Sequence, residues 1–313
     1  MSVPRPRAAA RIARTTAAGI GLVALVSACG ATASQAAPGT IAVVAAENQY
    51  GNVAAQVGGK DVSVTSIESN PNTDPHTYEV SPSVAEEVGA AQVVIQNGLG
   101  YDDYMTKIES ASPSQTRKLI NVQHLLGLAD STPNPHLWYD PTTMPKVANA
   151  LAADYAALKP ADASYFSANA AHFIASLNPW LQAIASFKAD YAGTPVATTE
   201  PVADYMLQAA GADNLTPFRF QADIMNGVDP SPQDVSLQDS LFAQHKVKVF
   251  VYNEQVTDTL TQTFISDAHS AHIPVIGVYE TMPTPGFTYQ SWMLAEVTAL
   301  RKAVADGVST QSL

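Results

Sequence analysis

Stretches with the character of buried strands alternate with helical patterns along most of this 313-residue chain. The strand-like stretches are short, β-branched or apolar, and bounded by turn residues, at 41–46, 62–67, 92–96, 195–199, 247–252 and 273–278. Helical patterns separate them at 50–57, 83–90, 202–210, 232–245 and 257–269. Because strands that alternate with helices form parallel sheets covered on both faces, we expect an α/β protein.

The order of these patterns predicts two lobes, each a mostly parallel sheet flanked by helices. The segment 160–192 is rich in alanine, carries large apolar residues near helical spacing, and separates the first alternating block from the second. We therefore expect an N-terminal lobe at 40–159, a C-terminal lobe at 193–313, and between them a linking helix that Pro179 kinks or interrupts. About 275 residues also exceed the usual size of a single core.

The N-terminal residues are expected to direct secretion and not to fold. Four arginines precede an apolar stretch at 17–28 that is too short for a permanent membrane span, so 1–28 is predicted to be a signal peptide. Small residues then lead into Cys29, the only cysteine, as in the bacterial lipobox. Lipidation of Cys29 would explain a lone thiol in a secreted protein, and 29–39 would be its tether. The alternative is an incidental cysteine ahead of an ordinary cleavage site.

The negative net charge of the chain argues against nucleic acid as a partner. The formal net charge is −12, and removal of 1–28, with four arginines and no acidic residue, changes it to −16. An acidic field raises the local concentration of cations, but it does not specify a metal site. No stretch after the tether is long and apolar enough to cross a membrane.

Two loops place a histidine directly after a proline. His76 follows Pro75 in the loop after the predicted strand at 62–67, where open α/β sheets bind ligands, and His136 follows Pro135 in a similar run. Proline restricts the backbone before each imidazole, which lowers the entropy lost when the ring is held in one direction. Imidazole nitrogen binds zinc, iron, copper and manganese. A single loop histidine is more often exposed or hydrogen-bonded, so both interpretations stay open at this point.

Four segments together resemble the solute-binding lipoproteins of zinc and manganese ABC importers along nearly the whole mature chain. They are Asp74-Pro75-His76 with Tyr78-Glu79 and Ser81-Pro82-Ser83, Asn97-Gly98-Leu99-Gly100-Tyr101-Asp102, Asn134-Pro135-His136-Leu137-Trp138-Tyr139-Asp140-Pro141, and Thr198-Thr199-Glu200-Pro201-Val202-Ala203-Asp204-Tyr205. The third is the most specific, since the family has asparagine-proline-histidine-x-tryptophan-x-aspartate-proline there. The resemblance implies a metal-type periplasmic-binding-protein fold, with two lobes joined by a long helix.

The resemblance also implies three metal ligands, His76, His136 and Glu200. The family has two histidines at the first two positions and either histidine or glutamate at the third. For Glu200 the alternative is a carboxylate at a helix N-terminus, stabilised by the helix dipole.

The fourth ligand departs from the family pattern. The family places an aspartate shortly before a tyrosine that opens the C-terminal helix; Tyr289 matches the tyrosine, but Phe287 and Thr288 stand at the acidic position. The nearest carboxylate is Glu280, at the end of the strand predicted at 273–278, and we expect it to be the fourth ligand. The alternative is an exposed strand-end glutamate, with water completing the metal's shell.

The remaining histidines are expected to be structural or solvated. His269 and His272 share one face of a predicted helix end, where histidine is commonly stabilised by the helix dipole. The others without matching partners are His124, His172 and His245. Glu254 resembles a family segment behind the site, so we interpret it as lobe packing or support of the ligands.

The resemblance implies a binding protein and not an enzyme. It would capture Zn²⁺ or Mn²⁺ between two lobes, as a lipoprotein monomer on the outside of the bacterial cell membrane, and deliver the ion to the permease of an ABC importer. Two imidazoles and two carboxylates suit capture better than catalysis, which needs an open coordination position. A metal-dependent hydrolase and a surface adhesin are the rival functions, but the chain has no His-Glu-x-x-His or Gly-x-Ser-x-Gly motif. Glutamate as third ligand makes the site compatible with manganese or ferrous iron, although zinc binds such ligands more tightly. The sequence therefore does not favour either zinc or manganese as the bound ion.

Overall fold

The computed structural model describes residues 39–313. The predicted signal peptide at 1–28, the predicted lipidation site Cys29 and the tether up to residue 38 lie outside the described residues. All described residues belong to one compact unit.

Four parallel strands form the first sheet, in the order β2-β1-β3-β4. Their bounds are β1 (Ile41–Glu47), β2 (Val62–Glu68), β3 (Val93–Gln96) and β4 (Lys118–Asn121). β1 pairs with both β2 and β3, so that Val44 stands opposite Thr65 on one side and Val94 on the other. Because all strands run in one direction, their carboxyl ends share one edge of the sheet, where the loops to the next helices start.

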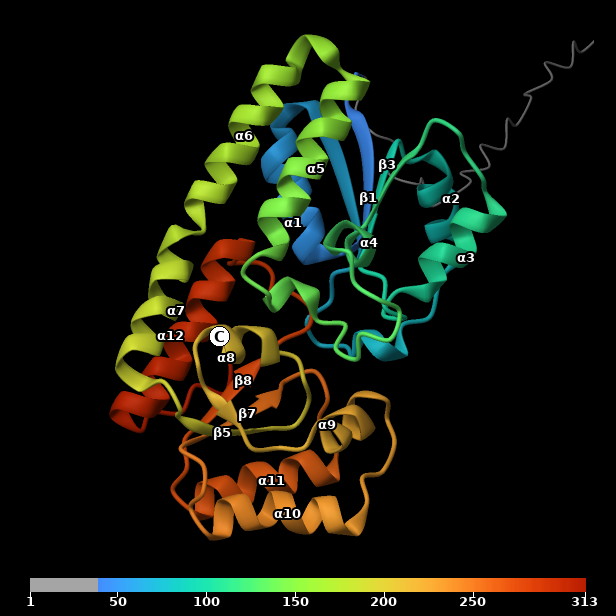
Figure 1. Ribbon diagram of the computed structural model, residues 1–313. Helices are drawn as coiled ribbons and strands as arrows, with labels where there is room; N and C mark the ends of the chain where they lie inside the picture. Colours follow the sequence, from blue (N-terminus) through green and yellow to red (C-terminus); the bar gives the residue numbers. More distant parts are fainter. Residues whose placement is uncertain (1–38) are drawn as a thin grey trace, which may run out of the picture. The chain divides into compact units, whose positions relative to one another are not determined.

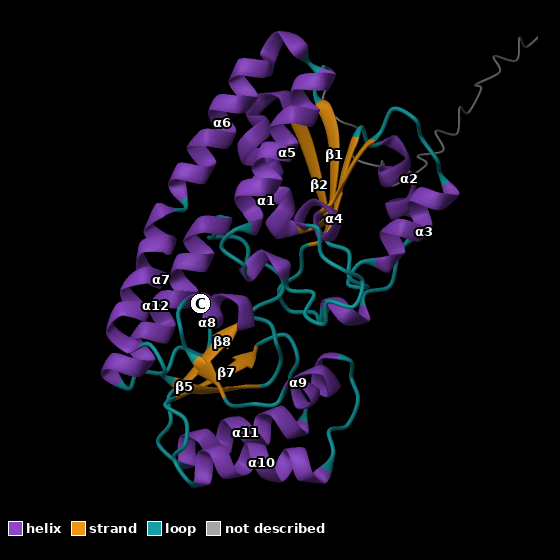
Figure 2. Cartoon of the chain, viewed as in Figure 1, coloured by secondary structure: helices purple, strands orange, loops and turns teal. Residues whose placement is uncertain are grey.

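The side chains of β1 explain why helices cover both faces of this sheet. Val43 and Ala45 belong to one buried core, whereas Val44 and Ala46 belong to another. Successive side chains of a strand point to opposite faces, so an apolar strand needs cover on both. In Figures 1 and 2, α1, α5 and α6 lie on one side of the strands, and α2 and α3 on the other. These helices are α1 (Asn48–Gly58), α2 (Pro82–Ala90), α3 (Asp103–Ala111), α5 (Thr143–Leu158) and α6 (Ala163–Ser176), with the short α4 (Val122–Leu126) after β4.

The second sheet repeats this plan, with parallel strands in the order β6-β5-β7-β8. Its strands are β5 (Pro195–Thr198), β6 (Asp213–Asn214), β7 (Val249–Asn253) and β8 (Val275–Val278). In β7, Val249 and Val251 join the core that contains α12, and Phe250 and Tyr252 join the core with α9, α10 and α11. The helices of this half are α7 (Asn178–Tyr191), α8 (Asp204–Ala209), α9 (Phe218–Met225), α10 (Pro232–Ala243), α11 (Thr259–Ser270) and α12 (Tyr289–Asp306).

The segment 160–192, predicted as a linking helix that Pro179 kinks or interrupts, contains a 3-10 turn (Pro160–Asp162) followed by two consecutive α-helices, α6 and α7. The break falls at Leu177, before Pro179 in the first turn of α7. Proline fits the first turn of a helix because no intrahelical partner is lost there, but it cannot continue a preceding helix. α7 runs beside α12 (Figure 1), and both contribute buried side chains to a core that also holds residues of both sheets.

The α/β architecture expected from the sequence is confirmed, with two parallel sheets flanked by helices. Six of the strands lie where the apolar stretches predicted them, and the two additional strands, β4 and β6, stand at sheet edges. The lobe boundaries at 40–159 and 193–313 stay a prediction. Among the described residues, no helix has the length and hydrophobicity of a membrane span.

Candidate metal centre

His76 is held in a short 3-10 turn, Pro75–Thr77, in the loop that follows β2. The carboxylate of Asp74 caps this turn, since it accepts a hydrogen bond from the backbone N–H of His76 at 2.8 Å. Proline in the first position supplies the backbone angle that the turn requires. The side chain of His76 is 19% exposed, so this imidazole keeps contact with solvent.

His136 is fully buried, immediately before the 3-10 turn Leu137–Tyr139. The side-chain oxygen of Asn134 accepts a hydrogen bond from the His136 backbone N–H (3.0 Å) and lies 2.8 Å from its Nδ1. An imidazole that donates from Nδ1 presents the lone pair of Nε2, which is the form that binds a metal. The amide of Asn134 donates to the Pro201 carbonyl, and Trp138 packs edge-on against the imidazole, 5.4 Å between ring centroids.

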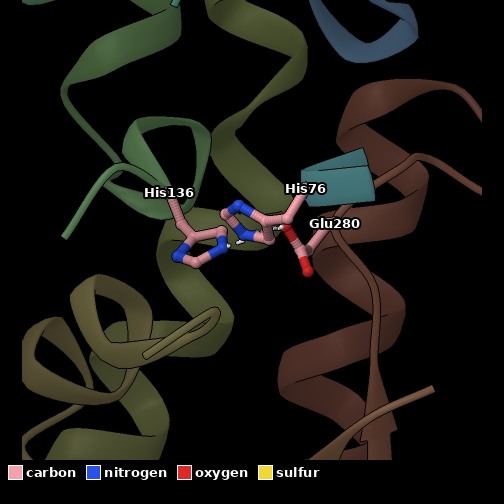
Figure 3. A group of neighbouring side chains, drawn as sticks. All are labelled: His76, His136 and Glu280. Carbon is pink, nitrogen blue, oxygen red and sulfur yellow. Dashed lines mark hydrogen bonds and ion pairs between the residues drawn. The ribbon is translucent and has the colours of Figure 1, made fainter. Parts of the chain in front are cut away.

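Glu280 follows β8 and meets both imidazoles, as Figure 3 shows. Its Oε2 lies 3.1 Å from Nε2 of His76 and 3.2 Å from Nε2 of His136. The same oxygen accepts a hydrogen bond from the Tyr101 hydroxyl at 2.9 Å. One donor atom from each of the three residues lies within 4.8 Å of the other two. Within the part of the chain that the structure describes, no other group of three histidine, cysteine or acidic side chains meets this condition.

Glu200, the third predicted ligand, is buried but stands outside this group. Its Oε1 accepts a hydrogen bond from the side-chain nitrogen of Asn253 at 3.2 Å. The same nitrogen donates to Oε1 of Glu280 at 2.7 Å. Among the described residues, Oε2 of Glu200 has no hydrogen-bond partner. The two carboxylates are therefore joined through one shared donor.

The pKa values of the two histidines are shifted in opposite directions. Burial lowers the pKa of His136, and the neighbouring Glu280 carboxylate only partly opposes this. Burial also acts to lower the pKa of His76, but the charge and the contact of Glu280 outweigh it and raise that pKa to about 9. In the metal-free protein the pair is thus a protonated His76 and a neutral His136, and an arriving cation competes with the proton on His76.

The pKa values of the two carboxylates, Glu280 and Glu200, are also shifted in opposite directions. Burial would raise the pKa of Glu280, but the two imidazoles hold it well below its usual range, so this residue is ionised. The pKa of Glu200 is raised, by burial first and then by the charge of Glu280. Glu280 contacts both imidazoles, whereas the charge of His76 opposes the shift at Glu200 only in part, so the two acidic groups do not ionise equally.

The sequence analysis assigned no role to three side chains that form hydrogen bonds with Glu280, namely Tyr101, Asn253 and Gln255. The side-chain oxygen of Gln255 accepts hydrogen bonds from the backbone N–H groups of Glu280 (2.7 Å) and Thr281 (2.8 Å). Asn253 and Gln255 flank Glu254 directly at the carboxyl end of β7, which is the signal that could have identified them.

The other residues singled out in the sequence lie away from this group. Tyr289 opens α12 as expected, and its hydroxyl donates to the Trp138 carbonyl at 2.6 Å. Thr288 caps α12, so the position where the family has an acidic residue serves the helix here. His269 and His272 stand at and just beyond the C-terminal end of α11.

A pocket of about 340 Å³ adjoins the turn that carries His76. Its lining includes Glu68, Asn70, Asp74, Tyr78, Glu79 and Thr281. His136 and Glu280 are fully buried, whereas His76 is not, so the side of the site nearest solvent is the His76 side.

Comparison with known proteins gives a family. The model of the family described as "Zinc-uptake complex component A periplasmic" (ZnuA) matches residues 43–303. The manganese-binding lipoprotein MntA of Bacillus subtilis (strain 168) is 28% identical over 152 residues, which are 46% of this chain and 49% of that protein. The match thus spans about half the length of this curated relative.

Solved structures agree in fold. A manganese-bound mutant of the periplasmic metal-binding protein from Candidatus Liberibacter asiaticus has a TM-score of 0.69 at 20% identity, over 85% of this chain and 100% of that chain. The SBP FpvC of Pseudomonas aeruginosa in complex with Ni²⁺ also has a TM-score of 0.69, at 19% identity, over 88% and 100% of the two chains. By the match to its model over most of its length, the chain belongs to the family of periplasmic zinc-uptake component A, whose members are solute-binding proteins.

Proposed function

We propose that this protein captures a divalent transition metal ion, Zn²⁺ or Mn²⁺, and delivers it to the permease of an ABC importer. The observation that supports this most directly is the convergence of His76, His136 and Glu280, whose donor atoms lie within 4.8 Å of one another. Two of these residues, His136 and Glu280, are fully buried. Imidazole nitrogen and carboxylate oxygen are donors that both ions accept. Glu200 supplies the fourth donor through Oε2, which has no other partner among the described residues.

Capture and release suit this site better than hydrolysis. Hydrolytic zinc sites keep one coordination position for water, whereas four protein donors fill a tetrahedral shell. The donors follow strands of both sheets: His76 comes after β2, and Glu200 and Glu280 come after β5 and β8. An ion bound here joins the two halves of the molecule, and its release requires them to separate slightly. The pocket beside His76 is our proposed access route.

Membrane attachment through Cys29 is part of the same proposal. It rests on the small residues that precede this cysteine in the sequence. A protein tethered outside the membrane stays close to its permease, which favours delivery of the ion.

The test is metal affinity, measured for Zn²⁺ and Mn²⁺ by competition with a chelator. The variants are His76→Ala, His136→Ala, Glu200→Ala and Glu280→Ala, and the matched control is His269→Ala, an exposed histidine on α11. The metal affinity of each ligand variant should fall by more than roughly 10- to 100-fold, which is the usual effect of replacing a residue that only hydrogen-bonds a metal ligand. The control should bind as the wild type does.

Two results would count against parts of the proposal. If Glu200→Ala binds like the wild type, the protein supplies three donors and solvent completes the shell. If all four variants bind like the wild type, the metal site lies elsewhere and the function proposed for these residues is wrong.

A further inference from the structure

Asn253 stands between the two carboxylates because of the strand order of the second sheet. β7 lies between β5 and β8, and Asn253 is its last residue. Glu200 follows β5 and Glu280 follows β8, so the central strand ends between the segments that carry them. Asn253 is 1% exposed, and its backbone N–H is fixed by a hydrogen bond to the Thr199 hydroxyl at 3.0 Å.

The orientation of the Asn253 amide follows from its partners. Its side-chain oxygen accepts a hydrogen bond from the backbone N–H of Gln255 at 3.0 Å, a group that can only donate. The nitrogen must therefore face the other way, toward the two carboxylates, which can only accept when ionised. It donates to Oε1 of Glu280 at 2.7 Å and to Oε1 of Glu200 at 3.2 Å. One amide nitrogen, which carries two hydrogens, thus lies within hydrogen-bond distance of both carboxylates.

These two hydrogen bonds turn one oxygen of each carboxylate toward Asn253, where a metal ion must compete with the amide for it. Glu280 faces His76 and His136 with Oε2, which also accepts from the Tyr101 hydroxyl, while its Oε1 is turned to Asn253. In Glu200, Oε1 is likewise turned to Asn253, and Oε2 has no partner among the described residues. Two imidazole nitrogens and two single carboxylate oxygens make four donors. Four donors suit tetrahedral Zn²⁺, whereas Mn²⁺ favours six, which carboxylates can help to supply when they bind through both oxygens.

Resting on the metal-binding function proposed above, we infer that Asn253 is a specificity-determining positioning residue. By restricting Glu200 and Glu280 to one donor oxygen each, it favours Zn²⁺ over Mn²⁺. Removal of its amide frees Oε1 of both carboxylates, which lets them bind an ion through two oxygens and raises the coordination number of the site.

The experiment compares wild type with Asn253→Leu, which has similar bulk and no donor, and with Asn253→Ala as a second variant should the first fail to fold. Affinities for Zn²⁺ and Mn²⁺ are measured by chelator competition, and Co²⁺ serves as a spectroscopic probe. The zinc affinity should fall by about 10- to 100-fold, the usual effect of losing an outer partner, while the manganese affinity is kept or rises. The visible absorption of bound Co²⁺ should change from the intense bands of four-coordination to the weak bands of higher coordination.

The matched control is Gln255→Ala, which removes a buried amide two residues away. Gln255 holds the backbone of Glu280 and not its carboxylate oxygens, so this variant should weaken both ions alike and leave their ratio unchanged. A zinc-to-manganese ratio that is the same in wild type and both Asn253 variants, with an unchanged Co²⁺ spectrum, overturns the inference alone. A wild type that binds neither ion overturns the proposed function, and this inference with it.

Discussion

Glu296 is a buried acid in α12 whose replacement by glutamine should change how stability depends on pH. It is 0% exposed, and its Oε1 accepts hydrogen bonds from Nε1 of Trp292 at 2.8 Å and from the hydroxyl of Tyr139 at 3.2 Å. The Tyr139 hydroxyl, whose single hydrogen the two acceptors share, also lies 2.9 Å from the carbonyl oxygen of Tyr279, the residue before Glu280. Glu296 therefore supports the segments behind two proposed ligands without touching either ligand.

The magnitude follows from the pKa of Glu296. Burial raises it from 4.5 to about 8, against the opposing effect of the hydrogen bonds from Trp292 and Tyr139. Above pH 4.5 the unfolded chain releases this proton while the folded protein keeps it, so the free energy of unfolding falls as pH rises, until the folded carboxyl also ionises near pH 8. Relative to acidic pH, where this carboxyl is protonated in both states, the free energy of unfolding is lower by less than about 1 kcal/mol at pH 5 and by about 4 kcal/mol at pH 8. Glutamine cannot ionise, so the Glu296→Gln variant avoids this loss. The difference in free energy of unfolding between variant and wild type should therefore shift by about 3 kcal/mol in favour of the variant from pH 5 to pH 8.

The assay is urea denaturation of both proteins at pH 5 and pH 8 with a chelator present, so that metal binding does not contribute. The difference between the two proteins isolates Glu296 from all other groups that titrate. The matched control is Glu86→Gln, the same substitution at an exposed glutamate on α2. If Glu296→Gln and wild type differ equally at pH 5 and pH 8, Glu296 is not held protonated and the reasoning from its burial is refuted.

Three further changes test other parts of the structure. Gly277→Ala would place a methyl group against the carbonyl of Gln311 and should destabilise the protein by about 1–3 kcal/mol, seen as a lower Tm; an unchanged Tm would show that the C-terminal segment moves aside. Tyr101→Phe removes a hydroxyl that donates to the buried Glu280 and should cost the metal-free protein about 1.5–3 kcal/mol in urea denaturation, unless another donor replaces it. Cys29→Ala should move the protein from the membrane to the soluble fraction, and retention on membranes after a high-salt wash would contradict the proposed anchor.

Most of the strands that could be predicted from the sequence are buried on both faces. β1, β3, β7 and β8 consist largely of β-branched or apolar residues, and burial on both faces demands such runs. β4 and β6 were missed because their own residues carry a weak signal: β4 includes Lys118 and exposed Leu119, and β6 is only Asp213–Asn214. The edge strand β2 was predicted because it is rich in β-branched residues. The places of β4 and β6 depend on pairing with a neighbour distant in sequence, which no local pattern records.

The candidate site was also only partly predictable from the sequence. The loops of His76 and His136 have distinctive sequences because proline and a capping side chain act within a few residues of each histidine. The convergence of Glu280 with these imidazoles depends on contacts between residues 144 and 204 positions apart, and a sequence alone gives only its place after a strand. The donor role of Asn253 was not predictable, since it arises from the order of β5, β7 and β8 in the sheet.

The packing of Trp138 on His136 provides an optical probe of the site that needs no label. All three tryptophans of the chain, Trp138, Trp180 and Trp292, are buried, so their emission is shielded from changes in solvent. Of these, Trp138 lies with its ring edge-on to a proposed ligand. Coordination of that imidazole changes the electric field at the indole, so the fluorescence of the native protein should follow occupancy during a titration. Trp138→Phe would identify this residue as the source of the signal, because Trp180 and Trp292 remain in place as internal references.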